Sequence, residues 1–248
     1  MSVRIAHPAL CPAILCSALA ATLAATLVAC TKGSEKYPGS YESAAGNVGA
    51  RASTTTATRP TASVPPGIDA VGTHGEDLFD QVKAGNWKKA TEHLDSLRAA
   101  VARLPADVDT KASLTALGDS LSRDIAGRRR EQGMIDANRV TYLAAEMVRP
   151  YESTVPVQVM LLDYDGRELE IWSAARDNEK LAATKRDLRR TWNEIRPEVQ
   201  KRNPKQAEHA ETLVARIDAA KTPAEVSKLA TAFLDEVDLL EKVFEARR

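Results

Sequence analysis

The sequence predicts an all-α fold, either an antiparallel helical bundle or a short stack of about four αα-hairpins. Apolar residues recur every three or four positions through most of residues 73–248, which is the spacing of an amphipathic helix. Capping residues, glycines and prolines interrupt this spacing, as they do where one helix ends and the next begins. Each expected element rests on one of these two signals.

Four helices are expected between residues 78 and 147. The first is short and ends at Ala84-Gly85, while Asn86 caps the second, which Pro105 stops. Gly127 interrupts the third helix and Pro150 ends the fourth. Their inward stripes are Leu78, Phe79 and Val82; Trp87, Ala90, Leu94, Leu97, Val101 and Leu104; Leu114, Leu117, Leu121 and Ile125; and Val140, Leu143 or Ala144, and Met147.

Three more helices are expected toward the C-terminus. One ends or kinks at Pro197, and the next begins at Asn203-Pro204. The last has the strongest signal, because Thr222-Pro223-Ala224-Glu225 combines a cap, a first-turn proline and the glutamate of a capping box. The inward stripes are Leu181, Leu188, Trp192 and Ile195; Ala210, Leu213, Val214 and Ile217; and Val226, Leu229, Phe233, Val237, Leu240 and Phe244.

Residues 155–172 fit two different structures. The alternation of Val157, Val159 and Leu161 before the turn pair Asp165-Gly166 is typical of a β-hairpin. Helical spacing also fits this segment, and Pro156 suits a first helical turn. The helical surroundings favour the helix.

A weak repeat relates the expected helices. Leu97, Val101 and Leu104 match Leu188, Trp192 and Ile195 at an offset of 91 residues, and the turns recur about every 45 residues. Four αα-hairpins of this length form either a short solenoid or two bundles. Chance similarity between amphipathic helices would produce the same matches.

The N-terminus has the features of an exported protein. Arg4 is followed by an apolar run from Pro8 to Leu27, and small residues precede Cys30. Leu27-Val28-Ala29-Cys30 resembles the lipobox of bacterial lipoproteins. The resemblance covers about the first 30 residues and implies cleavage before Cys30 and acylation of its thiol, by palmitate among other chains. The alternative for residues 8–29 is an uncleaved transmembrane helix.

Cleavage would divide the chain into a signal peptide (1–29), a tether (30–72) and a helical domain (73–248). The tether is rich in Ser, Thr, Ala, Gly and Pro and has no apolar periodicity, so we expect it to be disordered. In the lipoproteins that this signal resembles, an aspartate directly after the cysteine usually means retention in the inner membrane, so Thr31 favours the outer membrane, facing the periplasm. The inner membrane or the cell surface is the alternative. Cys11 and Cys16 leave with the signal, so the mature domain has no free thiol.

The sequence contains few signals of a catalytic, metal-binding or nucleic-acid-binding site. The chain has 34 basic and 34 acidic side chains, a balance that argues against nucleic-acid binding. It lacks a Gly-x-Ser-x-Gly motif, a metalloprotease helix and a phosphate loop, so we expect no enzymatic activity and assign no catalytic or metal-binding residue. Haem ligation is an alternative, and its candidate ligands are His93, His209, Met134, Met147 and Met160. His74 falls at the end of the expected tether.

Several charged or polar clusters remain. The acidic residues around Gly166 lack EF-hand spacing, and Asp163 with Arg167 forms an ordinary helical pair. Asn138 falls near an inner face, where we expect it to fix helix register. Two basic clusters suit anionic lipid or an acidic partner, although intramolecular pairing is the simpler expectation: Arg123, Arg128, Arg129, Arg130 and Arg139; and Lys185, Arg186, Arg189 and Arg190.

These features predict a lipid-anchored periplasmic helical protein that acts as a non-enzymatic binding or scaffolding module in the bacterial cell envelope. Its expected partners are the membrane, through Cys30, and another envelope protein that binds an exposed apolar or basic patch. No cofactor is expected. The alternative is a helical bundle that binds haem, a metal or a small ligand in a cavity lined by Met147, Met160, Tyr164 or Trp172.

Overall fold

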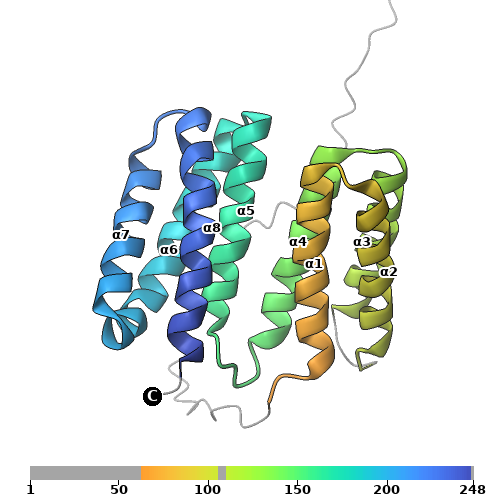
Figure 1. Cartoon of the computed structure of the whole chain (residues 1–248), viewed down its shortest axis with the longest axis horizontal. Coiled ribbons are helices and arrows are strands. Elements are labelled where there is room, and N and C mark those ends of the chain that lie inside the picture. The colour runs from red at the N-terminus through yellow and green to blue at the C-terminus, as the bar shows by residue number, and fades with distance from the viewer. Residues whose placement is uncertain (1–62, 106–109, 247–248) are drawn as a thin grey trace, which may run out of the picture. The chain divides into compact units, whose positions relative to one another are not determined.

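The computed structural model describes residues 63–105 and 110–246, which form an all-α structure and confirm the predicted fold class (Figure 1). These two ranges contain eight helices: α1 (Pro66–Ala84), α2 (Trp87–Arg103), α3 (Lys111–Ala126), α4 (Arg130–Val148), α5 (Val157–Ala175), α6 (Asn178–Arg202), α7 (Pro204–Ala219) and α8 (Pro223–Glu245).

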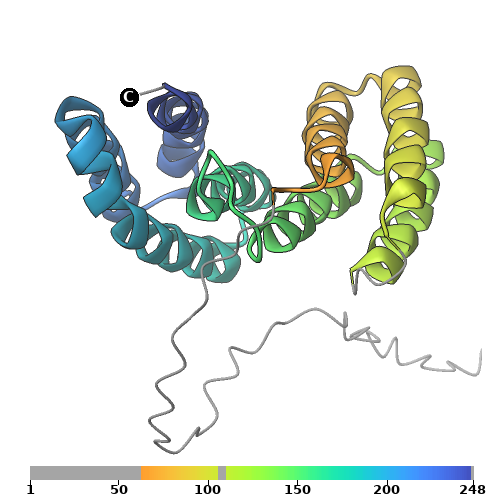
Figure 2. The same cartoon turned by 90° about the horizontal axis from the view of Figure 1, so that it is seen from below.

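The helices pack as two four-helix bundles. Helices α1 to α4 pack each on the next, and α1 closes the first bundle by packing on α4. Helices α5 to α8 follow the same order, with α5 packed on α8. Contact between α4 and α5 joins the bundles, and Figure 2 shows α1 and α8 on the same side of α5. The four expected αα-hairpins therefore pair into bundles.

Several helices begin at the caps that the sequence predicts. The Asn203 side-chain oxygen accepts a hydrogen bond from the Gln206 backbone amide at the start of α7, whereas the Asn86 side chain makes no such bond at the start of α2. At the start of α8, Thr222 Oγ1 accepts from the Glu225 amide while the Glu225 carboxylate accepts from the Thr222 amide. This reciprocal pair is the predicted capping box, and it satisfies two amides that the first turn leaves without helical partners.

The structure differs from the sequence-based prediction at two helix ends. Helix α1 begins at Pro66, so the helical part starts seven residues before the expected boundary at residue 73, and His74 lies inside it. Helix α6 continues through Pro197 to Arg202, so of the two expected outcomes, an end or a kink at the proline, the end is wrong. Val199, two residues beyond the proline, is fully buried, and its packing favours continuation of the helix. Residues 157–175 form helix α5, which settles the helix-or-hairpin alternative.

The two bundles repeat one another closely. The first residues of α1 and α5, and of α2 and α6, are 91 positions apart, and those of α3 and α7, and of α4 and α8, are 93 apart. Gly85 and Arg176, which end α1 and α5, both have left-handed backbones, with φ of 74° and 56°. The 91-residue offset found in the sequence therefore relates structurally equivalent positions.

Each bundle encloses an apolar core. Phe79 in the first bundle and Trp192 and Phe233 in the second are fully buried. Gly75 and Gly166 occupy equivalent places, where α1 meets Val140 and Thr141 of α4 and α5 meets Phe233 and Leu234 of α8. A Cβ atom at Gly75 would lie 3.0 Å from Val140 Cγ1, so the missing side chain allows close helix packing.

Candidate binding site

The predicted lipidation residue, Cys30, and the rest of the signal segment lie outside the residues that the structure describes. Within residues 63–105 and 110–246, no helix combines the length and hydrophobicity that crossing a membrane requires. The lipid anchor stays a prediction, and the candidate sites below come from the helical part of the chain.

A buried arginine joins the two bundles. The Arg167 side chain on α5 is 10% exposed, and its Nε donates to Asp163 Oδ2 at 2.8 Å on the same helix. Its Nη1 donates to Asp80 Oδ1 of α1 at 3.3 Å, and its guanidinium lies 5.0 Å from the centre of the Phe79 ring. The expected pair of Asp163 with Arg167 is therefore confirmed, and it extends into a contact between the bundles.

Further carboxylates surround this arginine, and we call the group the acidic junction. It consists of Glu76 and Asp80 on α1, Asp163 on α5, and Asp238 and Glu241 on α8. Glu76 Oε2 lies 4.0 Å from Arg167 Nη2. Asp80 and Asp238 are exposed, whereas the Asp163 side chain is 16% exposed. Three of these carboxyl groups, those of Glu76, Asp80 and Asp163, therefore lie within 4.0 Å of one guanidinium.

Burial and crowding raise the pKa values of three of these carboxyl groups. Partial burial of its carboxyl group and repulsion from Asp163 raise the pKa of Glu76 to about 8. The same two causes raise the pKa of Glu241 to about 7. Burial also raises the pKa of Asp163, although the Arg167 charge opposes this rise. Shifts in this direction mean that ionising the junction destabilises the folded protein, and a nearby cation would relieve that cost.

Helix α8 leaves a helix-binding face open beside the acidic junction. On the equivalent helix α4, Asn138 Nδ2 donates to the Tyr164 carbonyl oxygen at 3.2 Å, and the Tyr142 and Tyr164 rings lie 5.1 Å apart. The 93-residue offset places Thr231 and Asp235 at the corresponding positions of α8, and both are exposed. Exposure of these two residues leaves much of the corresponding face of α8 open to solvent, although Thr231 Oγ1 still donates to Glu170 Oε1 of α5 at 3.2 Å.

The polar groups around Gly166 mostly serve the contact between the bundles. Asn138 is fully buried, and its amide also donates to Glu168 Oε1 at 3.1 Å. The same glutamate accepts from the Trp172 indole. Glu170 accepts from Lys83 Nζ of α1 at 2.6 Å, and Asp165 accepts from Thr191 Oγ1 at 3.4 Å. Asn138 thus holds α4 in register with α5, as expected.

Three of the four residues in the second basic cluster bind groups of their own bundle. Lys185 Nζ donates to the carbonyl oxygens of Asp218 and Ala220, both at 2.9 Å, and Arg189 binds the carboxylates of Asp218 and Glu211. Arg190 pairs with Asp187 at 2.9 Å. In the first cluster, Arg129 pairs with buried Asp124 at 2.6 Å. The expected intramolecular pairing is confirmed at these positions.

A pocket of about 440 Å³ opens beside the second basic cluster, between α6, the end of α7 and the start of α8. Leu181, Lys185 and Val226 are among its lining residues. None of Met147, Met160, Tyr164 and Trp172, the side chains expected around a ligand cavity, lines it. Among the described residues, Leu239 is the large apolar side chain that is exposed, and the patch expected for an envelope partner stays a prediction.

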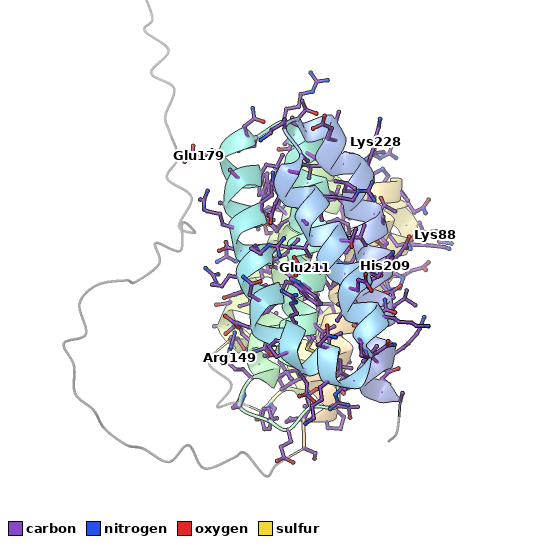
Figure 3. All side chains as sticks on the ribbon, turned by 90° about the vertical axis from the view of Figure 1, so that its left-hand side faces the viewer. Lys88, Arg149, Glu179, His209, Glu211 and Lys228 are labelled. Carbon is purple, nitrogen blue, oxygen red and sulfur yellow. The ribbon has the colours of Figure 1, made fainter. Side chains whose placement is uncertain are left out.

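The histidines lie at two separate places. Figure 3 shows His209 and Glu211 projecting from α7 to different sides, and His209 Nδ1 lies 2.5 Å from the buried carboxylate of Glu236 on α8. His74 and His93 come together across α1 and α2, beside Asp77. His93 and His209 are therefore in different bundles and at their surfaces, and Met134 and Met147 pack in the apolar core. Haem ligation by a histidine together with a methionine stays a prediction.

No local signal in the sequence indicates the acidic junction. Glu76 and Asp80 are four residues apart and therefore share a face of α1, but nothing near them in the chain indicates a partner. The 91-residue offset, which aligns Glu76 with Arg167, is the signal that could have drawn attention to both positions. No protein-family model, curated protein or solved structure matches the chain.

Proposed function

We propose that this protein is a non-enzymatic binding module, anchored by lipid on Cys30 to the outer membrane, that docks a basic helical segment of another envelope protein. The acidic junction is the observation that carries the proposal. The carboxyl groups of Glu76, Asp80 and Asp163 gather within 4.0 Å of one guanidinium, and burial together with repulsion from Asp163 raises the pKa values of Glu76 and Glu241. A cationic partner beside these groups would favour their ionised forms.

The open face of α8 supports a helix as the form of the partner. Within the chain, the corresponding face of α4 already receives a helix, α5, through Asn138 and Tyr142. A basic amphipathic helix beside α8 would place its lysines or arginines against Asp238 and Glu241, and its apolar residues near Leu239. Electrostatic attraction would also speed the encounter.

The binding experiment uses a fluorescently labelled synthetic helix with lysines along one face and leucines along the other. Full-length protein in detergent is titrated into it, and anisotropy gives the Kd. We expect the double substitution Asp80→Asn and Asp238→Asn to raise the Kd at least about tenfold, because both exposed charges face the peptide.

The matched control removes two exposed acids of α2, by Glu92→Gln and Asp95→Asn, and should leave the Kd unchanged. Equal binding by the wild type and the junction variant would contradict the proposed docking site. Higher salt should weaken binding to the wild type more than to the junction variant.

The anchor is tested separately. Cells that express the wild type should incorporate labelled palmitate into the protein, and Cys30→Ala should abolish this label. Retention of label in the Cys30→Ala protein would refute lipidation at this residue without affecting the docking proposal.

A further inference from the structure

We propose that His74, Asp77 and His93 form a binding site for a first-row divalent transition-metal ion, with Zn²⁺ as the reference ion. His74 and Asp77 lie three residues apart on α1 and so share one face. His93 projects from the neighbouring helix α2. One candidate ligand atom from each of the three side chains lies within 4.8 Å of the other two.

The distances suit a common ion. His93 Nδ1 lies 3.1 Å from Asp77 Oδ2, and His74 Nδ1 lies 3.9 Å from the same oxygen. Ligand atoms on a tetrahedral ion with bonds of about 2.1 Å are roughly 3.4 Å apart, so these two separations bracket the required value. Small side-chain rotations would bring all three atoms into the coordination sphere.

A polar atom without a partner points to a ligand at this place. His74 Nδ1 is buried and makes no hydrogen bond with any described residue. Buried nitrogen atoms are nearly always paired, and an exception commonly marks a bound water or ion. The His74 and His93 side chains are 26% and 30% exposed, so an ion has access from solvent.

The donor set selects the class of metal. Two imidazole nitrogens and one carboxylate oxygen suit Zn²⁺, Ni²⁺, Cu²⁺ or Fe²⁺, whereas Mg²⁺ and Ca²⁺ prefer oxygen ligands alone. Three protein ligands leave at least one coordination position for water or an external ligand. The site lies between α1 and α2 and uses none of the five carboxylates of the acidic junction, so it is tested independently of the proposed function.

The first test is a zinc titration of metal-stripped full-length protein in detergent, in competition with a fluorescent chelator. We expect one Zn²⁺ per chain in the wild type, and a Kd at least about tenfold higher in His74→Gln, Asp77→Asn and His93→Gln. His209→Gln is the matched control and should bind as the wild type does. Unchanged affinity in folded His74→Gln and His93→Gln proteins would overturn the proposal.

A second test needs the wild-type protein alone and does not depend on how the variants fold. Diethyl pyrocarbonate modifies accessible imidazoles, and peptide mass spectrometry measures the rate at each histidine. Zn²⁺ should slow modification of His74 and His93 at least about fivefold and leave His209 unchanged. Equal rates with and without Zn²⁺ at all three residues would overturn the assignment.

Discussion

Gly75 and Gly166 show how a single missing side chain sets the spacing between helices. A Cβ atom at Gly75 would meet Val140, Thr141 Cγ2 and the Thr141 backbone nitrogen at 3.0 to 3.2 Å. At Gly166 it would approach Leu234 Cδ2 to 2.6 Å, but that atom is the end of a side chain that can rotate. Gly72, by contrast, has its nearest neighbour, Ala144 Cβ, at an ordinary 3.5 Å.

We therefore expect opposite effects from three identical substitutions. Gly75→Ala should lower the free energy of unfolding by about 1–2 kcal/mol, because α4 backbone cannot move aside without repacking the core. Gly166→Ala should cost less, since Leu234 can rotate away. Gly72→Ala should raise stability by about 0.5–1 kcal/mol through its helix propensity. Urea denaturation measures all three, and a stabilised Gly75→Ala protein would contradict the packing argument.

At the scale of single helices, local signals account for most of the secondary structure. Helix α8 could be predicted because its cap, proline and apolar stripe all lie within the helix itself. The end of α6 could not be predicted in this way, because Pro197 is a local stop signal. The burial of Val199 in the core overrides this signal. The start of α1 was missed because Gly67 and Gly72 weaken the helical pattern before Leu78.

The capping box of α8 gives a prediction at this scale. Thr222→Ala should lower the free energy of unfolding by about 1 kcal/mol, because the Glu225 amide loses its acceptor. Thr212→Ala, an exposed threonine within α7, is the matched control and should be neutral or slightly stabilising. A loss of stability in Thr212→Ala equal to that in Thr222→Ala would show that the cap is not the cause. Thermal unfolding followed by circular dichroism provides the comparison.

At the scale of the whole helical part, the packing of distant helices creates the charged site, which local sequence patterns do not predict. The acidic junction assembles Glu76, Asp163 and Glu241 from segments that are far apart in the chain. Neither helical spacing nor composition reports which outer faces meet, so the junction becomes visible only when α1, α5 and α8 are placed together. The fold class was predictable from local patterns, whereas the charged site was not.

The junction also predicts how stability depends on pH. Glu76 and Glu241 have folded pKa values of about 8 and about 7, above the value of 4.5 for an unperturbed glutamate. The stability that these two groups contribute to the folded protein is fully present below about pH 4.5, and it is lost as the pH rises through 7 to 8. The free energy of unfolding should therefore decrease from pH 5 to pH 9, with the contribution of other groups superimposed.

Two variants isolate this contribution in urea denaturation. Glu241→Gln and Glu76→Gln should each flatten the decrease with pH and stabilise the protein most at pH 9. Glu92→Gln, on the exposed side of α2, should keep the wild-type slope. If all three variants retain that slope, the two junction glutamates do not carry the pH dependence.

The repeated bundles have a consequence for self-association. The fourth helix of one unit, α4, accepts the first helix of the next, α5, and an arrangement of this head-to-tail kind has no inherent end. Exposed Asp235 and Asp238 on α8, the fourth helix of the second unit, give that terminal face a negative charge. Two copies of this protein that approached through this face would meet with like charges there, and their repulsion opposes growth into polymers.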